Sequence, residues 1–330
     1  MNFLTIRGFE MIKITDSSRI RARKIARECL SKVSTHDHRL LGAKANAVIL
    51  HGLRGHMRTK AMRKLADALE DAGCNTTICD LPQHGTNAGK KQRWTKIKSF
   101  KDFVRIARAM TYITLLSRSR GDLPTFIIGY SLGALITIRL LQLNPFIRKN
   151  IKGVICLSTP LKVDHHAGKA IRRNRQLIER LSPFLLKYLP WLPVSKVPSS
   201  KTGRLAADDE EWVTDPLFYK GPLVFRMAWK IRTAAQNANN NLGLINMPIL
   251  FLHGGKDAIS PLSAVMKAYG NIPSEDKTLK LYKEVRHDII NGEVLEDMAH
   301  WLKERIRQYE KENGSTAKWN FKNLLKLFKK

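Results

Sequence analysis

The stretch Pro124-Thr-Phe-Ile-Ile-Gly-Tyr-Ser-Leu-Gly-Ala-Leu-Ile-Thr-Ile138 decides the fold of this 330-residue chain. A β-branched run ends in Gly129-Tyr-Ser-Leu-Gly133, and an apolar, helix-like stretch from Ala134 to Leu143 follows at once. This order predicts a buried strand, a sharp turn with Ser131 at its apex, and a helix. Glycines two residues before and two residues after Ser131 indicate a turn that is too tight for bulky side chains at those two positions. The serine hydroxyl is therefore expected to stand clear of a sheet, beside a helix N-terminus.

Two later segments supply an acid and a base. The apolar run Pro248–Asp257 predicts a strand that ends near Gly254-Gly255 and presents Asp257 on a loop. His287 lies just beyond another short predicted strand, Leu279–Tyr282. Serine, aspartate and histidine in this chain order are typical of the α/β-hydrolase triad.

Each of the three side chains has a chemical role in such a triad. Ser131 is too weak a nucleophile at its own pKa, so His287 would take its proton and later give it to the leaving group. Asp257 would hold the imidazole tautomer and stabilise the imidazolium. Taken singly, Asp257 and His287 are also compatible with solvated loop residues; combined with the serine turn, they predict the triad.

An upstream loop predicts the oxyanion hole. The short core strand Ala45–Leu50 runs into His51-Gly-Leu-Arg-Gly55. In this fold the loop after that strand lends a backbone N–H opposite the one that follows the nucleophile. We therefore predict that the amides of Leu53 and Leu132 form the hole. Because a backbone group carries no side-chain signature, the alternative that His51-Gly52 only makes a tight turn stays open.

From Ala45 to Gln308 the chain resembles the monoacylglycerol lipase and lysophospholipase branch of the α/β-hydrolases, often labelled serine-aminopeptidase-like. The resemblance departs from the family pattern at Gln83, where the family has glycine, and at Asn87, where it has serine. It implies a lipid-like carboxylic ester as substrate. The matching segments are His51-Gly52, Asp80–Asn87, Gly129–Gly133, Leu157–Leu161, Asp208–Leu217, Gly255–Asp257 and His287-Asp288.

Strands that alternate with helical stretches predict a mostly parallel sheet with helices on both faces. The resemblance implies that this sheet belongs to an α/β-hydrolase fold with an inserted helical cap. The alternation stops after residue 160 and resumes after residue 245. We therefore divide the chain into a basic N-terminal segment (1–44), a hydrolase core (45–160 and 246–312), a cap (161–245) and a basic amphipathic tail (313–330). Gly314 and Ser315 are expected to separate the tail from the helix Glu293–Lys311.

The cap contains an apolar stripe at helical spacing, and Pro183 is expected to open a second helix after Ser182. Two interpretations remain open: the stripe packs on the hydrolase core, or it lines an apolar entrance for an acyl chain. The stripe consists of Leu177, Ile178, Leu181, Phe184, Leu185, Tyr188 and Leu189.

Composition indicates a cytoplasmic protein. The first residues lack an adequate apolar region for a secretory signal, and no apolar run is long enough to span a bilayer. The four cysteines have no metal-ligand spacing and are expected to be reduced thiols. The pairs His165-His166 and His36 with His38 also lack such spacing, and no phosphate loop or dinucleotide fingerprint occurs. We expect neither metal nor cofactor.

The net charge of +30 favours anionic partners, although a diffuse excess can also serve solubility alone. The tail places Phe321, Leu324, Leu325 and Phe328 on one helical stripe among lysines. Such a helix suits the headgroup region of an anionic membrane, which predicts a peripheral membrane protein. The alternative is a helix docked on its own core. We do not expect nucleic acid as a partner, and the oligomeric state stays open.

The resulting hypothesis is a serine hydrolase that cleaves carboxylic esters of lipid-like substrates through an acyl-enzyme on Ser131. A thioesterase, an amidase or an acyltransferase would use the same residues. A non-catalytic protein that uses this fold to bind a membrane or nucleic acid is the alternative from another class.

Overall fold

A computed structural model of the chain describes residues 24, 26–31, 33–88, 97–116, 123–163, 174–194 and 210–327. Most of the basic N-terminal segment, the pair His165-His166 and the start of the acidic cap run at Asp208 lie outside these residues.

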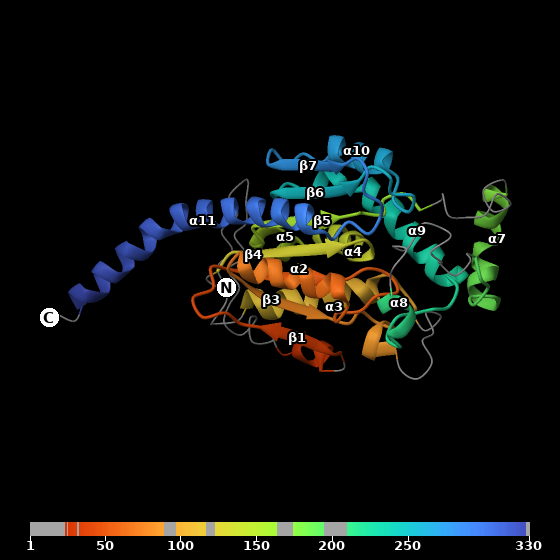
Figure 1. The fold of residues 1–330 in the computed structure, drawn as a ribbon, viewed down its shortest axis with the longest axis horizontal. Coiled ribbons are helices and arrows are strands. Elements are labelled where there is room, and N and C mark those ends of the chain that lie inside the picture. The colour runs from red at the N-terminus through yellow and green to blue at the C-terminus, as the bar shows by residue number, and fades with distance from the viewer. Residues whose placement is uncertain are drawn as a thin grey trace, which may run out of the picture.

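A seven-stranded sheet forms the centre of the described part of the chain, in the order β1-β3-β2-β4-β5-β6-β7 (Figure 1). Only the edge strand β1 is antiparallel, and it pairs with β3, while every other neighbouring pair is parallel. The predicted fold class is therefore confirmed. The strands are β1 (Thr35–His38), β2 (Ala45–Leu50), β3 (Cys74–Cys79), β4 (Thr125–Tyr130), β5 (Gly153–Leu157), β6 (Ile249–Gly254) and β7 (Lys277–Tyr282).

Helices cover both faces of the sheet, which explains why its strands β2, β5 and β6 are buried along their whole length. In β2, Val48 and Leu50 join one hydrophobic cluster, and Ala47 and Ile49 join the other. The first cluster contains buried side chains of α3 (Lys101–Leu116), α4 (Leu132–Leu143), α5 (Pro145–Asn150), α9 (Phe225–Asn240) and α10 (Leu262–Asn271). The second contains those of α2 (Lys60–Asp71) and α11 (Gly292–Leu327).

The cap region contributes α7 (Arg175–Tyr188), α8 (Glu210–Thr214) and α9. α9 packs against α4 on the core, with its Ala238 carbonyl accepting a hydrogen bond from Gln142. The apolar stripe of α7 is largely exposed: Leu177 and Phe184 each keep 55% of their surface accessible. Most of the stripe therefore does not pack on the hydrolase core.

The prediction of a second cap helix at Pro183 is wrong, because α7 runs unbroken with Pro183 in its interior. A proline cannot donate to the carbonyl four residues earlier, here that of Glu179. The Ser182 hydroxyl donates a 2.9 Å hydrogen bond to that carbonyl instead. A neighbouring side chain thus satisfies the acceptor that proline leaves open, and the helix continues.

Two further departures concern the ends of the fold. The basic N-terminal segment supplies β1, whose four residues are all exposed and therefore show no apolar alternation. α11 continues to Leu327, so Gly314 and Ser315 do not end it. Each of these residues disfavours a helix by only about 1 kcal/mol or less, which good helix formers on both sides offset. The far end of α11 projects beyond the rest of the fold (Figure 1).

No helix in the described part of the chain combines the length and the apolar character needed to cross a membrane. The short 3-10 turns η1 (Gly85–Ala88) and η5 (Leu242–Leu244) complete the described elements.

Candidate active site

Ser131 lies at the turn between β4 and α4 with φ 51° and ψ −115°, a conformation that non-glycine residues rarely adopt. Its amide donates a 2.8 Å hydrogen bond to the Leu157 carbonyl on the neighbouring strand. A Cβ added at Gly129 would lie 2.5 Å from Ala134 Cα, and one added at Gly133 would lie 1.9 Å from the Leu50 carbonyl oxygen. The turn is therefore as tight as the glycine spacing predicts.

The structure brings together the three side chains predicted for the triad. His287 Nε2 lies 2.9 Å from Ser131 Oγ, and His287 Nδ1 lies 2.8 Å from Asp257 Oδ2. Ser131 comes from the end of β4, Asp257 from the loop after β6 and His287 from the loop after β7. These loops meet at the carboxyl edge of the parallel sheet, where α/β folds place their ligands.

The surroundings of Asp257 keep its carboxylate ionised. Its Oδ1 accepts hydrogen bonds from the amides of Ile259 at 2.7 Å and Ser260 at 2.8 Å. Burial alone would raise the pKa of Asp257, but the hydrogen bond and charge of His287 and the Ser260 amide lower that pKa below its ordinary value. An ionised Asp257 accepts the Nδ1 proton of His287, which leaves Nε2 free to accept the proton of Ser131.

A second buried histidine, His253 at the end of β6, supports the loop of Asp257. Its Nε2 donates a 2.8 Å hydrogen bond to the Ser260 carbonyl and lies 3.8 Å from Asp257 Oδ2. Burial lowers the pKa of His253, which favours the neutral ring. Sequence reasoning missed this residue; its position four residues before Asp257 was the only signal.

Two hydrogen bonds hold the His287 loop against the rest of the site. The Tyr130 hydroxyl, next to the nucleophile, donates to Asp288 Oδ1 at 2.7 Å. The Ser158 hydroxyl, at the end of β5, donates to the His287 carbonyl at 2.8 Å. The residue before Ser131 and the residue after His287 are thus connected directly.

Of the two residues predicted to form the oxyanion hole, one directly follows Ser131 and the other directly follows a glycine that packs on the nucleophile turn. Leu132 follows it as the first residue of α4, where a backbone N–H has no acceptor within the helix. Leu53 follows Gly52, whose backbone packs on the nucleophile turn: a Cβ added there would lie 3.1 Å from the Tyr130 ring and 3.4 Å from Ser131 Cβ. Both residues therefore belong to backbone segments that border Ser131.

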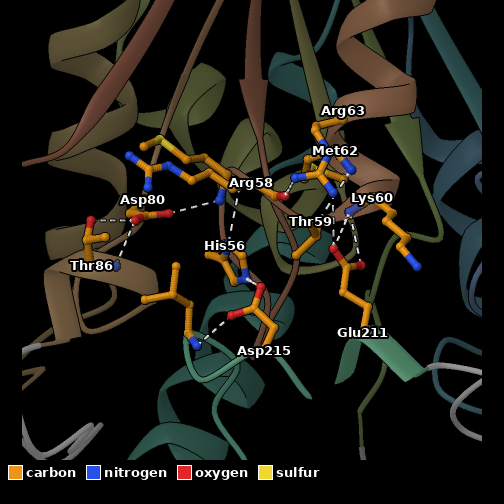
Figure 2. A network of polar contacts seen from close by, with 12 residues as sticks. His56, Arg58, Thr59, Lys60, Met62, Arg63, Asp80, Thr86, Glu211 and Asp215 are labelled. Atoms are coloured by element: carbon orange, nitrogen blue, oxygen red, sulfur yellow. Dashed lines mark hydrogen bonds and ion pairs between the residues drawn. The ribbon is translucent and has the colours of Figure 1, made fainter. Parts of the chain in front are cut away.

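Buried polar contacts fix the loop that carries Leu53. His51 Nδ1 donates to the Gly52 carbonyl at 2.8 Å, and His51 Nε2 accepts from the Leu81 amide at 2.9 Å. Burial lowers the pKa of His51 to about 4, so the ring stays neutral and keeps both bonds. Asp80 accepts hydrogen bonds from the amides of Met57 and Thr86, each at 2.8 Å (Figure 2).

At Gln83, where the chain departs from the family pattern, the backbone keeps the conformation expected for glycine. Gln83 adopts φ 61°, a left-handed conformation that suits the glycine of the pattern better than glutamine. The turn is therefore retained although the residue differs.

The parallel sheet, the serine at a strand-to-helix turn and the histidine between Ser131 and Asp257 define the α/β-hydrolase class. Within this class, the family model described as "Serine aminopeptidase, S33" matches residues 42–293. The chain belongs to this family and is a hydrolase. The family resemblance inferred from its motifs is confirmed.

Similar proteins include lipases. The monoacylglycerol lipase of Mycolicibacterium smegmatis is 23% identical over 259 residues, which cover 77% of this chain and 86% of that protein. Phospholipase YtpA of Bacillus subtilis is 24% identical over 263 residues, 76% of this chain and 90% of that protein. The crystal structure of the monoacylglycerol lipase from Paleococcus ferrophilus aligns with a TM-score of 0.65 and 21% identity, covering 83% of this chain and 99% of that one. The last likeness shows the shared fold.

Proposed function

We propose that the protein hydrolyses carboxylic esters of lipid-like substrates, monoacylglycerols or lysophospholipids, through an acyl-enzyme on Ser131. The observation that carries the proposal is the position of His287, hydrogen-bonded to Ser131 on one side and to Asp257 on the other. The names of the related lipases and phospholipase support the substrate class, as do the exposed apolar side chains of α7.

In the first half of the reaction, Ser131 Oγ attacks the acyl carbonyl carbon while His287 Nε2 takes the hydroxyl proton. The carbonyl oxygen becomes an oxyanion and accepts hydrogen bonds from the amides of Leu53 and Leu132. When the tetrahedral intermediate collapses, the ester C–O bond breaks and His287 gives its proton to the departing alcohol. The acyl group remains on Ser131.

In the second half, His287 takes a proton from water as the water oxygen attacks the acyl carbon. Collapse breaks the bond to Ser131 Oγ, which takes the proton back from His287, and the fatty acid leaves. Asp257 stays ionised throughout and stabilises the imidazolium that forms in each half. The low pKa of Asp257 suits this role.

The deciding experiment compares hydrolysis of acyl esters of increasing chain length by the wild type and Ser131→Ala. Activity that peaks at medium or long chains and falls by about 10⁴-fold or more in the variant supports the proposal. A preference for short esters would support Ser131 as the nucleophile but contradict a lipid-like substrate. A preference for thioesters or amides would mean that the substrate is not a carboxylic ester. Equal rates in both proteins, or none in either, would contradict the catalytic proposal.

We further propose that the protein works from the cytoplasm at an anionic membrane, bound through residues 313–330. The free state of all four cysteines supports a reducing compartment. Support for membrane binding comes from the five lysines of this segment and from the projection of α11 away from the fold (Figure 1).

A further inference from the structure

We propose that Arg54 is a positioning residue that clamps the oxyanion loop, His51–Gly55, to the cap segment Glu211–Gly221. Through this clamp it would fix the backbone amide of Leu53, its neighbour in the chain. The inference rests on the proposed function, because an oxyanion donor matters only if acyl transfer occurs at Ser131.

Arg54 is held to the cap in both directions. Its Nη1 donates hydrogen bonds to the carbonyls of Tyr219 at 3.0 Å and Gly221 at 2.6 Å. In return, the Tyr219 amide donates to the Arg54 carbonyl at 3.1 Å. The guanidinium carbon also lies 5.4 Å from the centre of the Tyr219 ring. Side chain and backbone of one residue thus bind the same short stretch of the cap.

The backbone of Arg54 is strained. Its φ of 74° lies in the left-handed region, which glycine adopts easily and arginine does not. The loop contains glycine at positions 52 and 55, yet arginine occupies the left-handed position. Strained residues of this kind persist where the surrounding contacts hold them, and they cluster at functional sites. The bonds to Tyr219 and Gly221 are among the contacts that hold Arg54.

Leu53 therefore lies between two anchors. On one side, Gly52 packs against the Tyr130 ring and Ser131 Cβ. On the other side, Arg54 is tied to the cap. An oxyanion donor works only when it points at the oxygen of the tetrahedral intermediate, and small displacements cost large factors in rate. The direction of the Leu53 amide thus depends on the position of the cap.

Other contacts between the cap and the core involve core residues that follow the oxyanion loop in the chain (Figure 2). His56 Nε2 lies 3.0 Å from Asp215 Oδ2, and Glu211 Oε1 accepts the Lys60 amide at 2.8 Å. Glu211 also pairs with Arg63, at 3.5 Å. Arg63 belongs to α2, beyond the oxyanion loop, so this ion pair joins the same two parts at a point outside residues 51–55. This makes Arg63→Ala the matched control for Arg54→Ala.

The test measures kcat and KM for a medium-chain acyl ester, together with the affinity of an alkyl trifluoromethyl ketone that forms a tetrahedral adduct with the nucleophilic serine. Arg54→Ala is expected to lower kcat by about 10- to 100-fold with KM within about threefold, because the lost interaction is specific to the transition state. Affinity for the ketone should fall by a similar factor. Arg54→Lys should recover part of both, since an ammonium group can donate to the same carbonyls. Arg63→Ala should stay within about threefold of wild type.

The clamp is overturned if Arg54→Ala keeps the wild-type kcat and ketone affinity, if Arg63→Ala loses as much, or if only KM changes. If Arg54→Ala fails to fold, kcat, KM and ketone affinity are measured on Arg54→Lys instead. Wild-type values of all three in Arg54→Lys then overturn the clamp. A wild type without esterase activity overturns the proposed function and the clamp together. An active wild type with equal Arg54→Ala and Arg63→Ala variants overturns the clamp alone.

Discussion

Three of the buried histidines, His51, His253 and His287, differ in what their ring nitrogens contact, and this difference limits what each ring can do. His287 faces a carboxylate and a hydroxyl, so its ring can exchange a proton during catalysis. His51 must accept the Leu81 amide, which only a neutral ring can do. His253 is desolvated and donates to a carbonyl. We infer that, of these three, only His287 exchanges a proton in the proposed reaction.

The neutral state of His51 predicts how stability depends on pH. Its pKa is about 4 in the folded protein, against 6.5 for an ordinary histidine. The unfolded chain therefore binds a proton between these values that the folded chain does not. The contribution of the neutral His51 to the free energy of unfolding is complete above pH 6.5 and is lost as the pH falls toward 4. Between pH 7 and pH 5 this loss amounts to about 2 kcal/mol of unfolding free energy.

Guanidinium unfolding at both pH values checks the prediction. His51→Gln should reduce the acid-induced loss of stability by about 2 kcal/mol, because the titrating group is gone. His300→Gln is the control, since that side chain is 73% exposed. Equal pH dependence in the two variants would show that His51 is not held neutral by the fold.

The sequence predicts the residues of the site unevenly, and the reason lies in their partners. Ser131, Asp257 and His287 each follow a recognisable strand and carry a side chain of known chemistry, so pattern and order were sufficient. Arg54 and His253 bind backbone carbonyls, those of Tyr219, Gly221 and Ser260. Every residue has a backbone carbonyl of the same chemistry, so the local sequence does not predict which carbonyl these side chains bind.

At the scale of the element, the strands and core helices followed the predicted pattern because their own residues determine them. The strands β2, β4, β5 and β6 and the helix after Ser131 are mainly apolar runs bounded by turns. The errors occurred where neighbouring residues determine whether a helix ends. Ser182 satisfies the acceptor that Pro183 leaves open, and α11 continues through Gly314 and Ser315. β1 is added to the sheet by pairing with β3 alone, without a buried face.

The tight packing at the serine turn predicts opposite effects for two glycine substitutions. Gly133→Ala should lower the free energy of unfolding by about 3 kcal/mol or more, because the new methyl would meet the rigid Leu50 carbonyl. Gly270→Ala, in α10, meets nothing within 4 Å and should leave stability unchanged or raise it by up to about 1 kcal/mol. Thermal and denaturant unfolding of both variants measures this difference. A Gly133→Ala protein as stable as Gly270→Ala would show that the turn can relax.

At the scale of the whole molecule, the exposed cap helix α7 and the far part of α11 lie at opposite ends (Figure 1). α7 presents exposed apolar side chains at one end of the long axis, and the far part of α11 projects at the other (Figure 1). The net charge of +30 gives the whole protein an attraction to anionic lipid. The five lysines and the apolar stripe of residues 313–330 combine both kinds of attraction, whereas the cap offers mainly apolar area.

Deletion of residues 315–330 should therefore weaken binding to vesicles that contain phosphatidylserine by at least about tenfold, since each lysine near such a surface contributes about 1 kcal/mol. Turnover of a short soluble ester should persist, because the part of this segment that the structure describes projects beyond the rest of the fold (Figure 1). Co-sedimentation at two salt concentrations measures the binding, and the electrostatic part should fall at high salt. Trp191→Ser is the control at the other end, where Trp191 is 58% exposed. If the deletion leaves vesicle binding unchanged while Trp191→Ser abolishes it, the cap rather than the tail is the membrane contact.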